Sequence, residues 1–109
     1  MAAFGTEFTA HMVSSEYGSG HWSELSLVPV APIPMHPATH VLHYASECFE
    51  GLKAYRTGGG SIHLFRPDRH VERMINSAAQ LMLPIPDRET LEASLHMAVA
   101  AVIDDVPAY

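Results

Sequence analysis

A helical repeat of apolar residues in the second half of the chain constrains its fold more than any other feature. Pro67 suits the first turn of such a helix, Asp68 adds negative charge there, and Pro84 ends the pattern. Because one face of this helix is apolar, we expect it to be buried against another layer of structure. The apolar residues recur at i, i+3, i+4, i+7, i+8 and i+11, which is the spacing of one helix face: Val71, Met74, Ile75, Ala78, Ala79 and Met82.

A second helix is predicted directly after the first. Asp87 is suited to cap its first turn, and the helix is expected to end before Pro107. Its apolar face is predicted to consist of Leu91, Leu95, Val99, Val102 and Ile103. The chain therefore closes with two helices that pack through apolar faces.

The region before these helices predicts strands and turns. Loose alternation of aromatic and β-branched residues over 4–13 indicates a strand, and the serines and glycines of 14–25 indicate a loop. Four prolines between Leu25 and Pro37 predict extended chain packed on the core, because proline cannot donate to a central sheet. A short strand is predicted at 40–46.

A β-hairpin is the clearest local prediction in this first half. Residues 50–56 and 61–65 each suggest a strand, and the glycine-rich run 57–60 joins them. A glycine-rich loop can also hold phosphate, but that use requires a helix directly after the glycines, and here a strand follows. The predicted fold class is α+β, with a strand-rich first half and a hairpin packed against two C-terminal helices.

Composition narrows the functional classes. The 109 residues, 48% of them hydrophobic, suffice for one domain, and a net charge of −6 disfavours nucleic acid and anionic membranes as partners. Cys48 is the single cysteine, so no intrachain disulfide is possible. We find no signal peptide and no run long enough to span a membrane, and we expect a cytoplasmic protein.

Eight histidines raise the question of a metal site. The densest group is His36, His40 and His43. In the predicted strand, His40 and His43 would point to opposite faces, and no glutamate stands between them as in a zinc protease motif. We therefore predict no metal site. Cys48, beside an aromatic residue, is interpreted as a buried structural thiol rather than an activated nucleophile.

Two further groups could carry chemistry. Glu47 and Glu50 could act as an acid and a base, although two carboxylates this close in sequence are usually surface residues. Arg73 lies beside the apolar face of the first predicted helix, and its planar guanidinium suits phosphate or carboxylate. From spacing alone, the simpler expectation is an ion pair between Arg73 and Glu72 or Asp68.

The runs LHYASECFEGLKAYR (42–56) and IHLFRPDRHVERMINSAAQLMLP (62–84) closely resemble the N-terminal part of branched-chain amino acid aminotransferases, which are fold-type IV enzymes that use pyridoxal 5′-phosphate (PLP). The opening run FGTEFTAHMV (4–13) is similar to that family's first strand. The segment 43–55 favours this family over its fold-type IV relatives, the D-amino acid aminotransferases and the aminodeoxychorismate lyases. Those enzymes carry a G-D-G-V-F/Y type of run at this place.

The resemblance implies roles for four residues. Arg73 matches the arginine that binds the PLP phosphate. Tyr44 matches a tyrosine that reaches the substrate pocket of the neighbouring subunit in a dimer. Phe49 and Phe4 match aromatic residues of the pocket wall around the apolar substrate side chain. Such a pocket would accept leucine, isoleucine and valine, because it separates single methylene groups only weakly.

The resemblance also implies that the chain is one part of an enzyme. The family's Schiff-base lysine lies in a larger second domain, whereas Lys53, the single lysine here, matches a position of the small domain. We therefore expect 1–109 to be an N-terminal small domain without catalytic residues of its own, inactive alone. The complete homodimeric enzyme would transfer the amino group to 2-oxoglutarate. One alternative is a non-catalytic module for oligomerisation or for binding a small anion. The other is a different fold-type IV PLP enzyme, such as a D-amino acid aminotransferase or an aminodeoxychorismate lyase.

Overall fold

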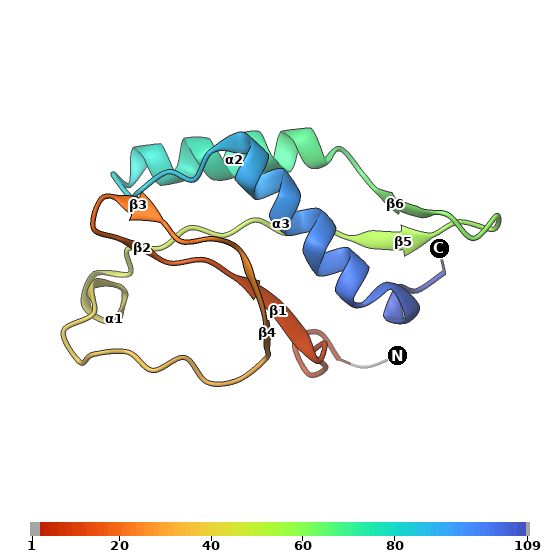
Figure 1. The fold of residues 1–109 in the computed structure, drawn as a ribbon, viewed down its shortest axis with the longest axis horizontal. Helices are drawn as coiled ribbons and strands as arrows, with labels where there is room; N and C mark the ends of the chain where they lie inside the picture. Colours follow the sequence, from red (N-terminus) through yellow and green to blue (C-terminus); the bar gives the residue numbers. More distant parts are fainter. Residues whose placement is uncertain (1–2, 109) are drawn as a thin grey trace.

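The computed structural model describes residues 3–108, which fold as a mixture of short antiparallel strand pairs and two long helices (Figure 1). The predicted α+β class is therefore confirmed. The last helical element is a short 3-10 helix, Ile103–Asp105, which the extended residues 106–108 follow. In chain order, the preceding elements are β1 (His11–Ser14), β2 (Tyr17–Gly18), β3 (His21–Trp22), β4 (Ser26–Pro29), α1 (His40–Tyr44), β5 (Ala54–Arg56), β6 (Ile62–Leu64), α2 (Pro67–Gln80) and α3 (Arg88–Ala101).

Helix α2 confirms the predicted amphipathic helix but is shorter than its apolar pattern. Pro67 occupies its first turn, and Val71 and Ala78 are buried. The helix ends in a Schellman arrangement, because Leu83 N–H donates to the carbonyl of Ala78 while Met82 adopts a left-handed conformation (φ 56°). Met82 and Ala79 are exposed, so their assignment to the buried face is wrong. The left-handed turn directs Met82 away from α2.

Helix α3 begins as predicted. The side chain of Asp87 accepts a hydrogen bond of 2.8 Å from the backbone N–H of Thr90, which satisfies one free donor of the first turn. The helix ends at Ala101, so Val102 and Ile103 do not continue its apolar face as predicted. Ile103 lies in the following 3-10 turn and is exposed.

The β5–β6 hairpin is also confirmed, with shorter strands than predicted. Ala54 pairs with Leu64 and Arg56 with Ile62 in an antiparallel register. The turn closes through a 2.9 Å hydrogen bond from Thr57 N–H to the carbonyl of Ser61. Gly60 has a φ of +85°, a conformation that favours glycine over residues with a side chain.

The first half differs most from expectation. Residues 40–46 were predicted as a strand, but His40–Tyr44 forms the short helix α1. Local hydrogen bonds stabilise it: the ring of His43 contacts the carbonyl of Pro37 at 2.6 Å, and the ring of His40 contacts the hydroxyl of Ser46 at 2.6 Å. The strand prediction is wrong because it rested on the alternation of apolar residues, whereas the polar contacts of His40 and His43 stabilise a helical turn.

The strand boundaries near the N-terminus also shift. The strand predicted over 4–13 is confirmed only from His11 onward, where β1 pairs with β4. The predicted loop contains the small β2–β3 hairpin, in which Tyr17 faces Trp22. Pro29 closes the end of β4 opposite His11, so the proline-rich stretch enters a sheet only at its margin.

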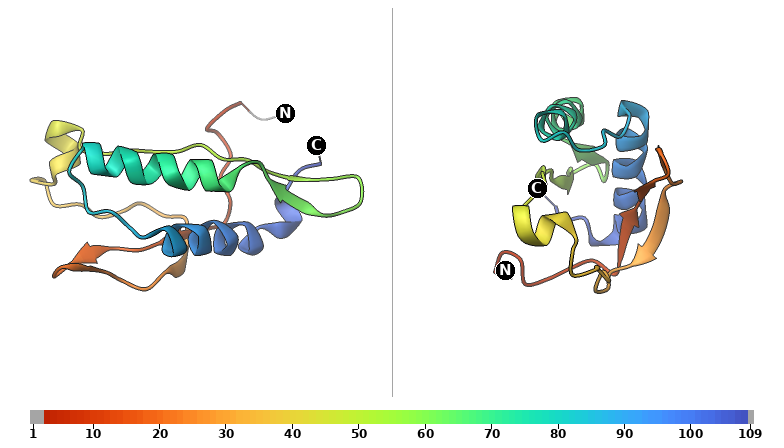
Figure 2. Two further views of the ribbon diagram at one scale, coloured as in Figure 1. Left: turned by 90° about the horizontal axis from the view of Figure 1, so that it is seen from above. Right: turned by 90° about the vertical axis from the view of Figure 1, so that its left-hand side faces the viewer.

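The elements form a thin, elongated body. Helix α3 contacts α2 on one side and β1 on the other, and the β5–β6 hairpin extends beyond the helices (Figure 1, Figure 2). The backbone N–H of Arg56 donates to the carbonyl of Pro107, which attaches the C-terminal segment to β5. Among residues 3–108, no helix is long and apolar enough to cross a membrane.

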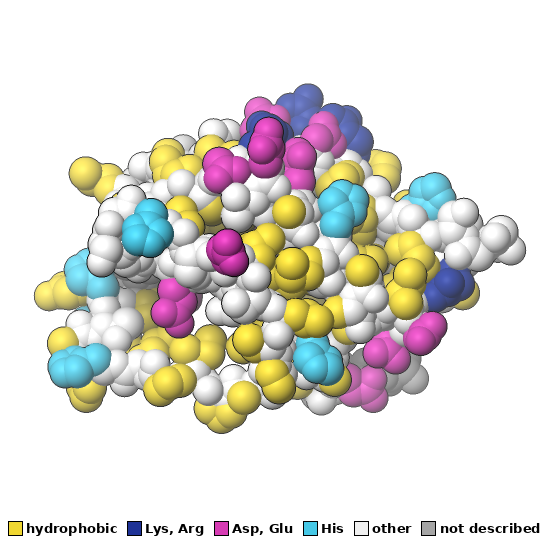
Figure 3. Space-filling view, in the orientation of Figure 1, with side chains coloured by type: hydrophobic (Ala, Val, Ile, Leu, Met, Phe, Trp, Pro, Cys, Tyr) yellow, Lys and Arg dark blue, Asp and Glu magenta, His cyan; other side chains and the backbone are white. Residues whose placement is uncertain are grey.

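The described part of the chain buries few side chains. Val71, Ala78 and Val106 are the buried apolar residues that form its core. The accessible surface is 8521 Å², whereas a compact monomer of this size exposes about 6,000 Å². The radius of gyration is 15.4 Å against about 13 Å for a compact domain. Large apolar side chains are accordingly spread over the surface (Figure 3).

Candidate functional site

A cluster of three charged or titratable side chains lies between α2 and the segment that precedes β5. We call Glu50, His70 and Arg73 the Glu50 cluster. Arg73 donates from Nε to Glu50 Oε1 and from Nη2 to Glu50 Oε2, each at 2.9 Å. His70 Nδ1 lies 2.8 Å from Glu50 Oε2. His70 and Arg73 are three residues apart on α2, so both reach the same carboxylate.

These pairings correct two expectations from the sequence. Arg73 does not pair with Glu72 or Asp68: Glu72 lies 3.4 Å from Arg69, and Asp68 lies 2.8 Å from Arg66. Glu50 is not an ordinary surface residue either, since its side chain is only 19% exposed.

Each member of the Glu50–Arg73 pair stabilises the charged form of the other. The hydrogen bonds from Arg73 and then from His70 lower the pKa of Glu50 from 4.5 to about 2. The same carboxylate raises the pKa of Arg73 above its ordinary value. Glu50 is therefore an anion at neutral pH. His70 Nδ1 lies between this carboxylate and Arg73 Nη2, which is 3.0 Å away, so the ring nitrogen donates to Glu50 in one tautomer and accepts from Arg73 in the other.

The lowered pKa predicts an acid dependence of stability. A carboxyl group whose pKa is lowered by folding stabilises the protein above the unfolded-state value, and this contribution is lost as the pH falls toward the folded-state value. We expect the free energy of unfolding to fall between about pH 4.5 and pH 2, and to fall less in Glu50→Gln. Urea unfolding at a series of pH values measures this difference.

A matched control is Glu72→Gln, whose carboxylate is more exposed and contacts Arg69 at 3.4 Å. Its pH profile should remain close to that of the unchanged chain. Equal slopes for Glu50→Gln and the unchanged chain would show that the Glu50 cluster does not form in solution.

Arg73 keeps part of its guanidinium available for a ligand. Its side chain is 59% exposed, and Nη1 makes no hydrogen bond with any residue that the structure describes. Because Glu50 holds Nε and Nη2, the free side of the planar group has a fixed direction. This geometry suits an oxyanion such as phosphate or carboxylate.

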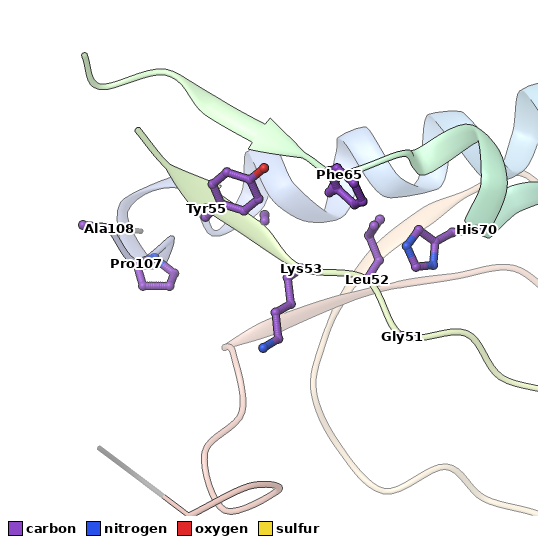
Figure 4. A pocket seen from close by; sticks show the side chains of 9 residues that line it. Gly51, Leu52, Lys53, Tyr55, Phe65, His70, Pro107 and Ala108 are labelled. Carbon is purple, nitrogen blue, oxygen red and sulfur yellow. The ribbon is translucent and has the colours of Figure 1, made fainter. Parts of the chain in front are cut away.

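A broad groove of about 1010 Å³ lies next to the Glu50 cluster (Figure 4). The ring of His70 forms one end, close to Leu52 and Phe65, and the C-terminal segment forms the other. Its lining residues are Gly51, Leu52, Lys53, Ala54, Tyr55, Phe65, His70, Pro107 and Ala108. The groove thus has a mostly apolar floor, and the titratable ring of His70 lies at one end of it.

The sequence matches known proteins across most of its length. The chain is 47% identical over 89 residues to the cytosolic branched-chain-amino-acid aminotransferase of Mus musculus. It is 46% identical over 92 residues to the branched-chain-amino-acid aminotransferase of Mycobacterium tuberculosis H37Rv, and 43% identical over 107 residues to a probable one of Streptomyces coelicolor. The chain is related to the branched-chain-amino-acid aminotransferases. The resemblance found in residues 42–56 and 62–84 is thereby confirmed.

The match covers the chain more fully than it covers these aminotransferases. It includes 81%, 83% and 97% of the chain in the mouse, M. tuberculosis and S. coelicolor comparisons, in that order. The same matches span 23%, 25% and 30% of the relatives. The chain therefore spans less than a third of the length of these relatives, between 23% and 30%. No family model matches it.

The three aromatic residues that the aminotransferase resemblance assigns to substrate lie at the surface. Tyr44 at the end of α1 is 72% exposed, Phe49 is 87% exposed, and Phe4 extends fully into solvent. None of them lines the groove beside the Glu50 cluster. Phe49 directly precedes Glu50 in the chain. The ring of Tyr44 packs at a tilt against the ring of His40, with 4.4 Å between the ring centroids. Their assignment to substrate stays a prediction.

The remaining candidates have ordinary surroundings. Lys53 extends from the floor of the groove, away from Phe65 (Figure 4). Cys48 is partly buried, and its Sγ lies 3.5 Å from Met74 Sδ, as a structural thiol would. Within residues 3–108, no three metal-binding side chains lie together, and the densest histidines contact backbone or hydroxyl groups instead.

The sequence pointed to Glu50 only as a possible acid or base beside Glu47, and it indicated no role for His70. A signal for His70 was present, because it lies one helical turn before Arg73 and therefore on the same face of α2. Glu50 offered no such signal, since it is 23 residues from Arg73 and meets it only through the fold.

Proposed function

We propose that this chain is the small domain of a PLP-dependent branched-chain aminotransferase and that Arg73 binds the phosphate of the cofactor. The observation that carries the proposal is the anchored guanidinium of Arg73, which presents a free side to solvent in a chain related to these enzymes. When bound, PLP supplies the aldehyde through which an amino group passes from an amino acid to a 2-oxo acid.

The structure contains a donor that fits the phosphate group. A guanidinium held by a carboxylate offers a directed hydrogen bond to an anion, which a freely rotating arginine would offer only at an entropic cost. Arg73 would supply one phosphate contact, and the rest of the enzyme would supply the others. Lys53 is the single lysine and is not assigned to the cofactor, so we propose that the chain alone is inactive.

The proposed substrates are leucine, isoleucine and valine, with 2-oxoglutarate as the acceptor. Tyr44, Phe49 and Phe4 would form part of an apolar wall once a second domain or subunit covers them. Their exposure agrees with this role, because a pocket wall that a second domain or subunit completes is exposed in its absence. We place the complete protein in the cytoplasm as a homodimer.

The second candidate is a module for oligomerisation without catalysis. Its support is the accessible surface, which exceeds the expectation for a compact monomer by roughly 2,500 Å², an area typical of one side of a large interface. Light scattering on the purified chain would detect such self-association.

The decisive experiment is a chimaera. The part of the chain that aligns over 92 residues replaces the matching segment of the M. tuberculosis aminotransferase, to which it is 46% identical. We expect the chimaera with PLP to transaminate leucine with 2-oxoglutarate, and the isolated chain with PLP to show no turnover. A chimaera that folds and dimerises but stays inactive would contradict the proposed function.

A further inference from the structure

We propose that Glu50 is a positioning residue for Arg73 and that it orients the guanidinium for the anion. This inference rests on the proposed function of Arg73 and adds two residues, Glu50 and His70, to which no anion-binding role has been given. Neither of them would touch the anion; both would act through the direction in which Arg73 points.

The first support is the geometry of the ion pair. Glu50 accepts two parallel hydrogen bonds of 2.9 Å from Nε and Nη2 of Arg73, which is the bidentate arrangement that fixes a guanidinium plane most firmly. The carboxylate comes from a different part of the chain than α2, so Arg73 is fixed relative to two segments. The side of the guanidinium that carries Nη1 is then left for a ligand.

The second support is the way in which the carboxylate itself is held. Glu50 is mostly covered, and His70 Nδ1 contacts its Oε2 at 2.8 Å from the preceding turn of α2. The same Nδ1 lies 3.0 Å from Arg73 Nη2, so it donates to Glu50 when it carries a proton and accepts from Arg73 when it does not. His70 thus contacts both members of the ion pair, and Glu50 restricts Arg73 through two hydrogen bonds.

The negative charge of Glu50 weakens phosphate binding, whereas its orientation of Arg73 strengthens it. A carboxylate beside Arg73 repels a phosphate, so removing it would strengthen binding if repulsion were its main effect. Because the Arg73 side chain is 59% exposed, water and salt screen that repulsion. The loss of orientation is not screened, and fixing one long side chain changes affinity by about threefold to tenfold.

Two substitutions separate these effects. Glu50→Ala and Glu50→Gln both remove the charge, but glutamine keeps an oxygen that can accept from Nε. We expect the affinity of the full chain for inorganic phosphate, measured by NMR titration, to fall about threefold to tenfold in Glu50→Ala and less in Glu50→Gln. We also expect a resolved Arg73 Nε–H signal in the unliganded chain that is lost in Glu50→Ala.

The controls distinguish the positioning role of Glu50 from the phosphate-binding role of Arg73. Arg73→Ala should abolish the phosphate response, and Arg69→Ala on the same helix should leave it unchanged. If both Glu50 variants bind phosphate more tightly by the same factor, the carboxylate is only a competing anion and its positioning role is wrong. If Arg73→Ala binds phosphate as well as the unchanged chain, the proposed role of Arg73 itself fails.

Discussion

Replacing Arg73 by alanine is expected to lower the affinity of the chimaera for PLP by about tenfold to a hundredfold, the range for losing one hydrogen bond to a charged group. The loss should appear in a fluorescence titration with PLP and as a faster release of cofactor on dilution. The physical reason is that Arg73 offers a cationic donor whose direction is fixed by two hydrogen bonds to Glu50.

Arg69→Ala is the matched control for this experiment. Arg69 lies one turn earlier on α2 and is similarly exposed, and among the described residues its side chain hydrogen-bonds only to Glu72, at 3.4 Å. It carries the same charge, so its removal tests the general electrostatic effect of one arginine. Equal losses in the two variants would mean that Arg73 has no specific contact with the cofactor phosphate.

Ala78→Asp is expected to unfold the chain or to reduce its stability by at least about 3 kcal/mol, because it places a carboxylate at a position that is only 3% exposed. Ala78 lies on α2, which packs against α3, and buried side chains are scarce in this structure. Loss of this position therefore removes a large share of the core. Urea unfolding followed by circular dichroism measures the change.

Ala79→Asp provides the control at the adjacent position. Ala79 is exposed, so its aspartate remains hydrated, and both substitutions have nearly the same distance to the negative end of the helix dipole. We expect a change within about 0.5 kcal/mol. Similar unfolding midpoints for the two variants would contradict the described orientation of α2.

The sequence predicts those elements that local interactions determine. Helix α2 and the capped start of α3 were recognised from periodicity, proline and Asp87, and the β5–β6 hairpin from its glycines. Helix α1 was not recognised, because it has one and a half turns and depends on contacts of His40 and His43 with residues outside it. Intrinsic preference is a weak guide at that length.

In the candidate site too, the sequence predicts what depends on local pattern and misses what depends on tertiary contacts. Arg73 was found from its place in a recognisable segment, and its exposure on α2 agrees with a binding role. Its partner was predicted wrongly, because spacing favours Glu72 or Asp68, whereas the fold brings in Glu50 from 23 residues away. Only a tertiary structure can reveal a pairing of this kind.

The scarcity of buried side chains has a consequence for how the stability of this chain must be described. A partner that binds the exposed apolar surface of the folded chain stabilises the folded state, and the added free energy rises with the logarithm of the partner's concentration. The melting temperature would then depend on the concentrations of the chain and of its partner in the sample. The balance between the folded and unfolded chain is a property of the mixture in which it is dissolved.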